Sequence, residues 1–373
     1  MGGNNMGCLL NLELKSSAKM KIGIITLFGL SNNGNRLQNL AVTELLQRRG
    51  FTVESVVCEK ITIRSIKNDL RRMLFFWSGY SKRYRAFKRW NKKYMKVRFF
   101  VSQNLKMPQR VNNKYDIFVV GSDQVWNPEI RQNERDTFFL KFTNKEKRVC
   151  LSPSIGVSSI SNQYYDIYKD GLSGFNYLSC REEDGSREIS RITGKECETL
   201  IDPSLALDSD YWRSVGNYKL VPNNNFLIQL FLSQPKTDVL ESISEYAKCN
   251  NYEIIDLMDV ESPYYSQAPD AFISLIDKAQ IVFTDSFHAV AFSVNLNTPF
   301  YAFDRTVDSY NEGLSSMNSR ITSLLSKLYL SNRFLKAPID KYQQSLDFCK
   351  SNEVLAHCRY DFNNYLSKVL DKS

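Results

Sequence analysis

One of the two histidines in this 373-residue chain stands where it could transfer protons. His288 lies in the segment 284–289 (TDSFHA), directly after a short apolar run. Asp285 or Ser286 can cap a helix that starts there, which would place His288 in the first turn, at the positive end of the helix dipole. Imidazole titrates near neutrality and suits acid–base catalysis. A lone histidine is more often structural, and only the strand-end position favours catalysis; we expect no role for His357.

A second loop carries a carboxylate, an amide and an indole. The segment 121–128 (GSDQVWNP) follows another apolar run and contains Asp123, Gln124 and Trp126. An indole face beside hydrogen-bonding groups is a good surface for a sugar. The alternative is that Asp123 caps a turn while Trp126 packs in the core.

A third loop, residues 31–38 (SNNGNRLQ), is rich in asparagine. Gly34 would permit a tight turn and the close approach of a ligand. Asn33, Asn35 and Gln38 offer neutral donors and acceptors beside a helix N-terminus, which suits sugar hydroxyls or an anion. The spacing is not G-x-G-x-x-G, so it gives little support to a dinucleotide site. An asparagine-rich loop with a helix cap is the alternative.

An alternation of apolar segments and helically spaced segments positions these loops. Strands are predicted at 22–28, 51–57, 115–120, 147–151 and 177–180, and again at 226–232, 252–257, 281–284 and 299–303. Helices are predicted at 37–49, 236–248, 271–279 and from Phe287. Strands separated by helices form parallel sheets, and the restart after Pro203 predicts two of them. Ligands then bind at the carboxyl ends of the strands, in the cleft between two domains.

The pattern divides the chain into three parts. Residues 1–19 are expected to be a disordered leader or added tail, because they lack the basic and apolar regions of a signal peptide. Residues 20–204 and 205–373 are each predicted to form an α/β domain, and the last helix of the second can pack back on the first. A helical insertion at 60–100 interrupts the first domain.

Composition argues against several classes of protein. Hydrophobic residues make up 43% of the chain and charged residues 24%, values typical of a globular protein. Eight cysteines are scattered without a C-x-x-C pair, which argues against a zinc site and against a secreted disulfide framework. No apolar run approaches the ~18 residues of a membrane helix. We therefore predict a cytoplasmic protein without a bound metal.

One stretch, residues 60–98, is strongly basic. It holds fourteen lysines and arginines but a single acidic residue, Asp69, and aromatic residues such as Trp77 and Trp90 are interspersed among them. A basic, aromatic helical segment can lie on an anionic membrane surface, which is the partner we predict for it. Nucleic-acid binding and a solvated insertion, whose aromatic residues pack on the first domain, are the alternatives.

The chain resembles the polysaccharide pyruvyl transferases from Lys21 to about Arg333. Seven motifs carry the resemblance and occur in the family's order: NGNRLQ at 33–38, GSDQVWN at 121–127, SPSIG at 152–156, SCREEDG at 179–185, DPS at 202–204, TDSFHA at 284–289 and NSRI at 318–321. Each motif is modest alone, but the ordered set is specific. The resemblance implies an α/β protein with two Rossmann-like domains in a GT-B-like arrangement and the active site between them.

The resemblance also implies a reaction. The family transfers the pyruvyl group of phosphoenolpyruvate to a sugar, usually as a ketal on two hydroxyls, and releases phosphate. It implies no cofactor besides this donor, and an acceptor that is a capsular or cell-surface precursor, carried on a lipid at the inner face of the membrane. His288, Arg181 and Asp123 are the predicted catalytic residues. The predicted acceptor-binding residues are Asn33, Asn35, Gln38, Gln124 and Trp126.

Phosphoenolpyruvate carries a carboxylate and a phosphate, so its site needs arginines. By resemblance, Arg181 in the S-x-R-[ED] motif binds the donor; alone, it could equally form an ion pair on a surface loop. Some members have R-x-H at the late motif, whereas Ser286 stands two residues before the histidine here. Arg305 or Arg320, the latter beside Asn318, could supply the missing charge, and Arg320 is preferred. Together with Ser286 these form the predicted donor set.

Two other functions remain open from the sequence. A GT-B glycosyltransferase would share the architecture but would bind a nucleotide-sugar instead of phosphoenolpyruvate. An adaptor that acts only through residues 60–98 on membranes or nucleic acid would be indifferent to the replacement of His288. That reading leaves the three polar loops without a purpose.

Overall fold

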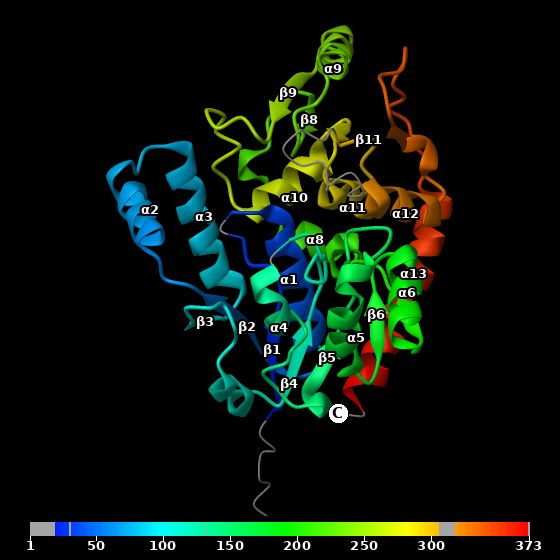
Figure 1. The fold of residues 1–373 in the computed structure, drawn as a ribbon. Helices are drawn as coiled ribbons and strands as arrows, with labels where there is room; N and C mark the ends of the chain where they lie inside the picture. Colours follow the sequence, from blue (N-terminus) through cyan, green and yellow to red (C-terminus); the bar gives the residue numbers. More distant parts are fainter. Residues whose placement is uncertain (1–18, 30, 131, 306–317, 372–373) are drawn as a thin grey trace, which may run out of the picture.

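The computed structural model of the protein describes residues 19–29, 31–130, 132–305 and 318–371. The predicted leader, apart from its last residue, lies outside the described residues. Figure 1 shows two α/β domains, one above the other, in the predicted GT-B-like arrangement. Among the described helices, none combines the length and hydropathy that a membrane span requires.

The first domain is built on a parallel sheet of five strands. These are β1 (Lys21–Ile25), β2 (Thr52–Glu59), β3 (Val97–Val101), β4 (Ile117–Val120) and β5 (Arg148–Cys150), in the order β3-β2-β1-β4-β5. This is the Rossmann order, with β1 at the centre. Ile22 of β1 lies between Val53 and Ile117 and is fully buried. A strand covered on both faces needs such a continuous apolar run.

The second domain repeats the plan with another strand order. Its strands are β8 (Phe226–Leu230), β9 (Glu253–Asp256), β10 (Val282–Thr284), β11 (Phe300–Phe303) and β12 (Phe334–Leu335), in the order β12-β11-β10-β8-β9. All pairs are parallel. This is the flavodoxin-like order, which confirms the predicted second parallel sheet.

Helices connect and cover the strands. In the first domain they are α1 (Asn33–Gln47), α4 (Arg135–Phe138), α5 (Tyr165–Ser173) and α6 (Glu183–Thr193), with a two-stranded sheet of β6 (Leu178–Cys180) and β7 (Cys197–Thr199) beside them. In the second they are α8 (Ser209–Val215), α9 (Thr237–Asn250), α10 (Pro269–Lys278), α11 (Phe287–Leu296) and α12 (Ser319–Lys327). Nearly every residue of helix α11 is buried, so the helix has no need of a solvent-facing polar side.

One of the three hydrophobic clusters among the described residues spans the two domains, and each domain has a further cluster of its own. A single apolar cluster includes Ile22 of β1 and Ile228 of β8. The predicted boundary after residue 204 falls inside α7 (Pro203–Ala206), which contacts helices of both domains. The last helix, α13 (Cys349–Leu370), reaches the first domain, where the Tyr365 hydroxyl donates to the Cys150 carbonyl over 3.1 Å. The helix therefore ties the two domains together.

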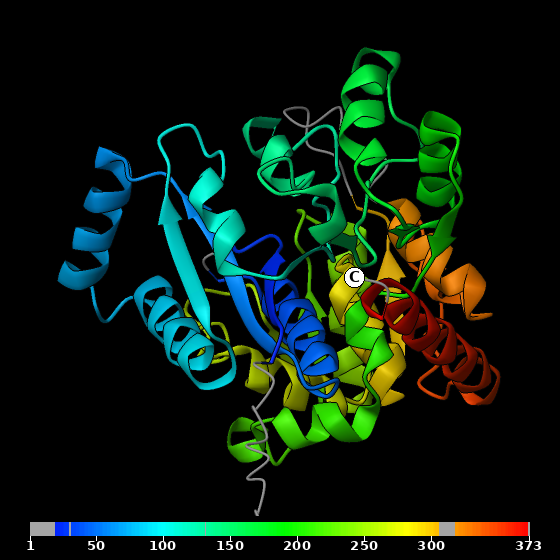
Figure 2. The same ribbon diagram turned by 90° about the horizontal axis from the view of Figure 1, so that it is seen from below.

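The basic stretch is two helices followed by a strand, rather than one helical insertion. Helices α2 (Ile63–Leu74) and α3 (Gly79–Tyr94) lead into β3, the edge strand of the first sheet. Figures 1 and 2 show α2 outermost and the α2–α3 pair on the side of the molecule opposite α13. The insertion predicted at 60–100 therefore ends in a strand that the sequence analysis missed, because charges surround its short apolar run.

Helix α3 packs inward, contrary to a wholly exposed basic surface. Phe87 and Trp90 are buried, as is Arg83, which donates to the carbonyls of Ser31 and Tyr265. Trp90 is therefore not available to a membrane. Trp90 belongs to the apolar cluster that contains Ile22 of β1, so it packs inward as the insertion alternative predicted.

Helix α1 begins four residues earlier than predicted. Asn32 is its N-cap, and the side chain accepts a hydrogen bond from the Asn35 backbone N–H over 3.0 Å. Gly34 is consequently the second residue of a helix and not a turn glycine. Residues 33–38 of the asparagine-rich loop predicted at 31–38 are therefore helical.

Candidate functional site

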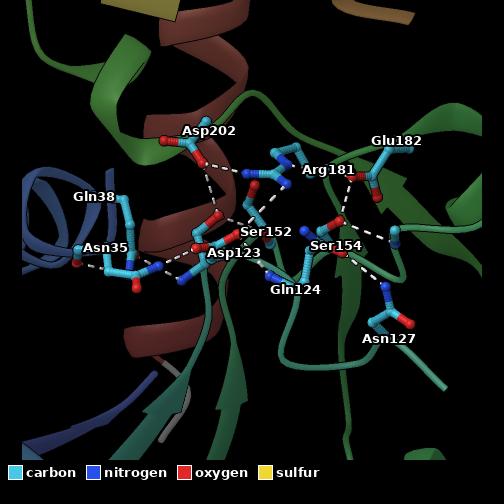
Figure 3. Close-up of polar contacts among 12 residues, drawn as sticks. Asn35, Gln38, Asp123, Gln124, Asn127, Ser152, Ser154, Arg181, Glu182 and Asp202 are labelled. Atoms are coloured by element: carbon cyan, nitrogen blue, oxygen red, sulfur yellow. Dashed lines mark hydrogen bonds and ion pairs between the residues drawn. The ribbon is translucent and has the colours of Figure 1, made fainter. Parts of the chain in front are cut away.

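The three predicted loops meet between the two sheets. The first turn of α1, the exit of β4, the segment after β6 and the first turn of α11 converge there, and all but the last are drawn in Figure 3. The titratable members of the cluster, which influence one another electrostatically, are Asp123, Arg181, Glu182, Asp202, His288 and Arg320. The strand ends thus form a mainly buried, charged centre, as is usual in parallel α/β folds.

Arg181 is the hub of this centre. Its side chain is only 3% exposed, and Nη1 lies 2.8 Å from Asp202 Oδ2 while Nε lies 3.3 Å from Glu182 Oε1. Nη2 lies 3.9 Å from Asp123 Oδ1. Burial lowers the pKa of Arg181, but the three carboxylates more than reverse this, so the pKa is raised. Arg181 is therefore charged and enclosed: the ion pair with a neighbouring glutamate that the alternative proposed is present, but it is buried and not on a surface loop.

Asp202 is the principal partner of Arg181, a role that was not predicted from its sequence motif. It caps α7, and its Oδ1 accepts from the Ser204 backbone N–H (2.9 Å) and hydroxyl (2.7 Å). Burial raises its pKa, but Arg181 and His288 lower it further, so the net shift is downward. The Asp-Pro-Ser motif signalled a helix cap, whereas the pairing with Arg181 spans 21 residues and has no local signal.

Asp123 is held from the α1 side by predicted acceptor residues. The Asn35 amide donates to Asp123 Oδ2. Gln38 is fully buried; its Nε2 donates to Thr26 Oγ1 (2.8 Å), and its Oε1 accepts from the Ser122 backbone N–H (3.1 Å). Gln38 therefore braces the β4 exit and does not face a sugar, contrary to prediction. Asn35 orients Asp123.

His288 lies in the first turn of α11, as predicted, against the first turn of α1. A methyl group added at Gly34 would overlap the imidazole ring, so only glycine permits this approach. The buried Nε2 atom makes no hydrogen bond to any described residue. Burial lowers the pKa of His288, and the opposing effects of Asp202 and Asp123 do not restore it. The imidazole is therefore neutral at pH 7.

Neither Asp285 nor Ser286 caps α11 through its side chain, contrary to prediction. Ser286 occupies the N-cap position but makes no capping bond through its side chain. Asp285 turns away and accepts from the backbone N–H groups of Leu232 (2.6 Å) and Ser233 (2.9 Å). Asp285 thus fixes the exit of β8 relative to β10, which leaves the N-terminus of α11 open beside His288.

Of the two candidate replacement arginines, Arg320 reaches the centre. It is buried, and it lies 3.0 and 3.2 Å from the Gln124 side-chain amide when the amide oxygen faces it. Burial, reinforced by Arg181, lowers the pKa of Arg320 to about 10, so it stays charged at neutral pH. Gln124 therefore touches a donor-site candidate instead of standing apart as an acceptor residue.

Arg305 and Asn318 are engaged beside the centre. Arg305 Nε lies 3.4 Å from Asp285 Oδ2, and its backbone N–H donates to Asn318 Oδ1 over 3.1 Å. The Asn318 amide donates to Asp304. Both residues link the end of β11 to the start of α12, which carries Arg320. In addition to burial, the positive charge of Arg305 contributes to the lowered pKa of Arg320.

Trp126 does not form the predicted sugar surface. It is 1% exposed, its Nε1 donates to the Phe138 carbonyl over 3.1 Å, and its rings pack against Phe139 and Phe175. The core alternative is correct, because the apolar interior of the first domain encloses the indole. Asn33 remains at the centre, with a buried Oδ1 that has no partner among the described residues.

Three side-chain nitrogen atoms in the centre, two from guanidinium groups and one from an imidazole, are buried without a hydrogen bond to the described part of the chain. They are Arg181 Nη2, His288 Nε2 and Arg320 Nε. Buried polar atoms are nearly always paired, so three such nitrogens in one cluster indicate a place for an anionic ligand. Across the described ranges, no group of three or more His, Cys, Asp or Glu side chains is arranged to hold a metal ion.

The free space at this cluster is narrow. A pocket of about 20 Å³ borders Arg181, Asp202, Phe287 and Arg320, whereas cavities of about 470, 660 and 670 Å³ lie elsewhere. The polar groups, and not the volume, mark this pocket as the candidate site. Arg181 belongs to one domain and Arg320 to the other, so domain separation would widen it.

One comparison with known proteins, the match to a family model, agrees with the motifs. The family model described as polysaccharide pyruvyl transferase matches residues 32–306. No curated protein matches the chain. Among solved structures, the UDP-GlcNAc 2-epimerase from Neisseria meningitidis is 11% identical and aligns over 95% of this chain and 100% of that chain, with a TM-score of 0.47. The UDP-N-acetylglucosamine 2-epimerase from Rickettsia bellii is 10% identical over the same shares, with a TM-score of 0.46.

We predict that Asp202→Asn destabilises the fold by about 3–5 kcal/mol at pH 7, because it breaks a buried ion pair and leaves Arg181 undercompensated. Chemical denaturation would measure this. The lowered pKa of Asp202 means that its contribution is present above the pKa of the unfolded state and is lost as the pH falls through the folded value. The difference between the two proteins should therefore shrink in acid.

Asp170→Asn is the matched control, because Asp170 is an exposed carboxylate paired with Lys141. Its loss should change the unfolding free energy by less than about 1 kcal/mol. Equal effects of the two substitutions would contradict the central role of the buried pair.

Proposed function

Because the chain belongs to the polysaccharide pyruvyl transferase family, we propose that it transfers the pyruvyl group of phosphoenolpyruvate to two hydroxyls of a sugar, forms a ketal and releases phosphate. The observation that supports this most is the convergence of Arg181 Nη2, His288 Nε2 and Arg320 Nε, all buried and without a hydrogen-bond partner among the described residues. Two guanidinium groups and an imidazole suit a donor that carries a carboxylate and a phosphate.

Arg181 and Arg320 hold the donor in this proposal. Both guanidinium groups lie over the Phe287 ring, at 4.2 and 5.9 Å from its centroid, so one aromatic ring contacts both cations. Ser286, which replaces an arginine found in some members, leaves Arg320 to supply the second charge. Donor entry requires the pocket of about 20 Å³ to open, and the arginines come from different domains. Closure of the domains on the donor would then exclude water from it.

The proton transfers balance with one histidine. Neutral His288 relays one proton from the first sugar hydroxyl to C3: C3 takes up a proton and becomes the methyl group as C2 becomes cationic and bonds to the hydroxyl oxygen, so no carbanion forms at C3. The second hydroxyl then bonds to C2 as the bond from C2 to the phosphate oxygen breaks, and its proton leaves with the phosphate. Asp123 and Asp202 oppose the lowering of the His288 pKa and stabilise the transient imidazolium.

The acceptor is a sugar of a polysaccharide precursor, and Asn33 is the acceptor residue best placed to meet it. Its Oδ1 is buried without a partner in the described ranges. The side-chain amides of Asn35 and Gln38, in contrast, already form hydrogen bonds with Asp123 and with the backbone of Ser122 at the β4 exit. A hydroxyl that donates to Asn33 would lie on the α1 turn that also touches His288. This arrangement brings the attacking oxygen to the base.

Peripheral contact with an anionic membrane belongs to this proposal, and α2 is the element that makes it. Large apolar side chains lie along one exposed face of α2 and the turn after it: Ile63, Ile66, Leu70, Leu74, Phe75, Phe76 and Trp77, each at least 50% exposed. Arg64, Lys67 and Arg71 form a basic stripe next to this face. An amphipathic helix of this kind lies in the plane of an anionic surface, with its apolar face in the headgroup region.

His288→Ala should lower turnover by about 10²- to 10⁴-fold, the usual span for an acid–base group, without loss of folding. The measurement is phosphate release with a sugar acceptor and phosphoenolpyruvate. Because burial lowers the pKa of His288, kcat/KM of the wild type should fall in acid, with an inflection below pH 6.5 that the variant lacks. His357→Ala, an exposed histidine on α13, is the control and should be unchanged. Wild-type turnover in His288→Ala would refute the proposed role.

Arg181→Lys and Arg320→Met should each weaken phosphoenolpyruvate binding by about 10- to 100-fold in calorimetry, since a hydrogen bond to a charged group contributes roughly 1.5–3 kcal/mol. Lysine keeps the charge among the carboxylates but loses the planar fork. Arg333→Lys alters another buried arginine, one that bonds the carbonyls of Gln343 and Ser345, and should bind the donor normally. A protein that binds a nucleotide-sugar but not phosphoenolpyruvate would support the glycosyltransferase alternative.

The double change Ile66→Glu and Leu70→Glu should abolish co-sedimentation with anionic vesicles, because carboxylates would replace the apolar contact and repel the surface. Wild-type binding should need anionic lipid and weaken with salt. Ile167→Glu on α5 alters an apolar side chain that is 40% exposed and should have no effect. A dimer in ultracentrifugation that the double change dissociates would instead assign this face to a second copy of the chain.

A further inference from the structure

The cavity of about 470 Å³ in the first domain is separate from the site described above. It lies between α3 and the β2–β3 edge of the first sheet, two elements that stand side by side in Figure 1. Its lining combines cationic and apolar side chains: Phe28, Arg36, Glu59, Tyr84, Lys88, Asn91, Lys92, Met95, Val97 and Phe99. Arg36 belongs to the NGNRLQ motif, but neither the roles proposed for that motif nor the proposed proton transfers account for the cavity.

Arg36 is the unusual member of this lining. It is only 1% exposed, yet its Nε and Nη1 make no hydrogen bond within the described part of the chain. Its guanidinium lies 3.6 Å from the centroid of the Phe28 ring. Burial lowers the pKa of Arg36 to about 9, so the group is still charged at neutral pH. A cation–π contact contributes about 2 kcal/mol when desolvated, which is less than the cost of burying an unpaired charge.

Further positive charge faces the same space. Lys88 and Lys92 are four residues apart on α3 and therefore project from the same side of that helix. The Asn91 side-chain oxygen, buried there without a partner in the described ranges, is an acceptor that suits a hydroxyl, so the preference for an anion rests on Arg36 and the two lysines. Glu59, at the exposed end of β2, is the one acidic residue of the lining. The cavity therefore favours an anion with several oxygens.

The remaining walls are apolar. Phe28 and Phe99 meet edge to face, with centroids 6.0 Å apart and an interplanar angle of 80°, so they do not form a slot for a flat ring. Met95 and Val97 continue this wall. Tyr84, on α3, lies under the guanidinium of Arg72 from α2, which connects the cavity to the helix with the exposed apolar face. A flexible apolar chain fits these walls better than a nucleobase.

The geometry points to a binding site for a phosphate or diphosphate ester that carries an apolar chain, with Arg36, Lys88 and Lys92 on the phosphate oxygens and the aromatic wall on the chain. Arg36 and Gly34 are two residues apart on α1, so they lie on opposite sides of the same helical turn, and Gly34 touches His288. Resting on the proposed function, the ligand is the lipid phosphate of the sugar acceptor, anchored across this turn from the reacting hydroxyls.

Calorimetry with two probes tests this in the full-length protein and without phosphoenolpyruvate. Farnesyl diphosphate supplies both the anion and the chain, whereas inorganic pyrophosphate supplies the anion alone. We expect farnesyl diphosphate to bind at least about 10-fold more tightly. Arg36→Met should weaken its binding by about 10-fold or more, because a hydrogen bond to a charged group is lost. Since replacing a buried charge by an apolar side chain of similar size is often neutral or stabilising, the variant should fold.

Substitutions of exposed lysines keep the test valid if Arg36→Met fails to fold. Lys88→Gln with Lys92→Gln alters exposed side chains and should weaken binding several-fold, whereas Lys82→Gln, an exposed lysine of α3 outside the lining, should not. His288→Ala should bind both probes normally, which separates this site from the proposed reaction. Absence of binding, equal affinity for the two probes, or unchanged affinity in both Arg36→Met and the Lys88/Lys92 pair would overturn the assignment.

Discussion

The burial of one guanidinium among three carboxylates organises this molecule. Arg181 is enclosed between the domains, and the ion pair with Asp202, 2.8 Å long, joins the segment after β6 to α7, the helix at the domain junction. A buried charge is expensive unless it is paired and fully hydrogen-bonded. Asp123 and Glu182 complete the pairing on two sides only, and Arg181 Nη2 keeps no close partner among the described residues. The same interaction thus holds the junction and leaves a donor for an anion.

The second constraint is the contact of two helix N-termini. Both α1 and α11 follow central strands of parallel sheets, so their first turns point into the space between the domains. They come so close that Gly34 has no room for a side chain beside His288. An imidazole packed this way is desolvated, and burial lowers its pKa despite two nearby carboxylates. The neutral histidine is therefore a consequence of how the two sheets are packed.

Local patterns predicted most of the fold, because strand periodicity and helix spacing are properties of short segments. The strands and the converging loops follow from apolar runs such as the one around Ile22. Long-range facts did not follow. Trp126 and Gln38 belong to the core and to the β4 exit, which depends on residues far along the chain. Asp202 had a visible cap signal, but its partner Arg181 comes from another motif.

The basic stretch shows how one composition can serve two environments. In α3 the aromatic residues turn inward, Phe87 and Trp90 are buried, and the lysines left on the surface border a cavity. In α2 the apolar residues turn outward, with Ile63 75% exposed. The number of charged residues does not predict this difference between α2 and α3, because the difference depends on which face of each helix packs against the first sheet. A run of basic residues therefore predicts a positively charged surface. Whether that surface contacts a bilayer or lines a cavity for an anion beside Arg36 depends on how each helix packs.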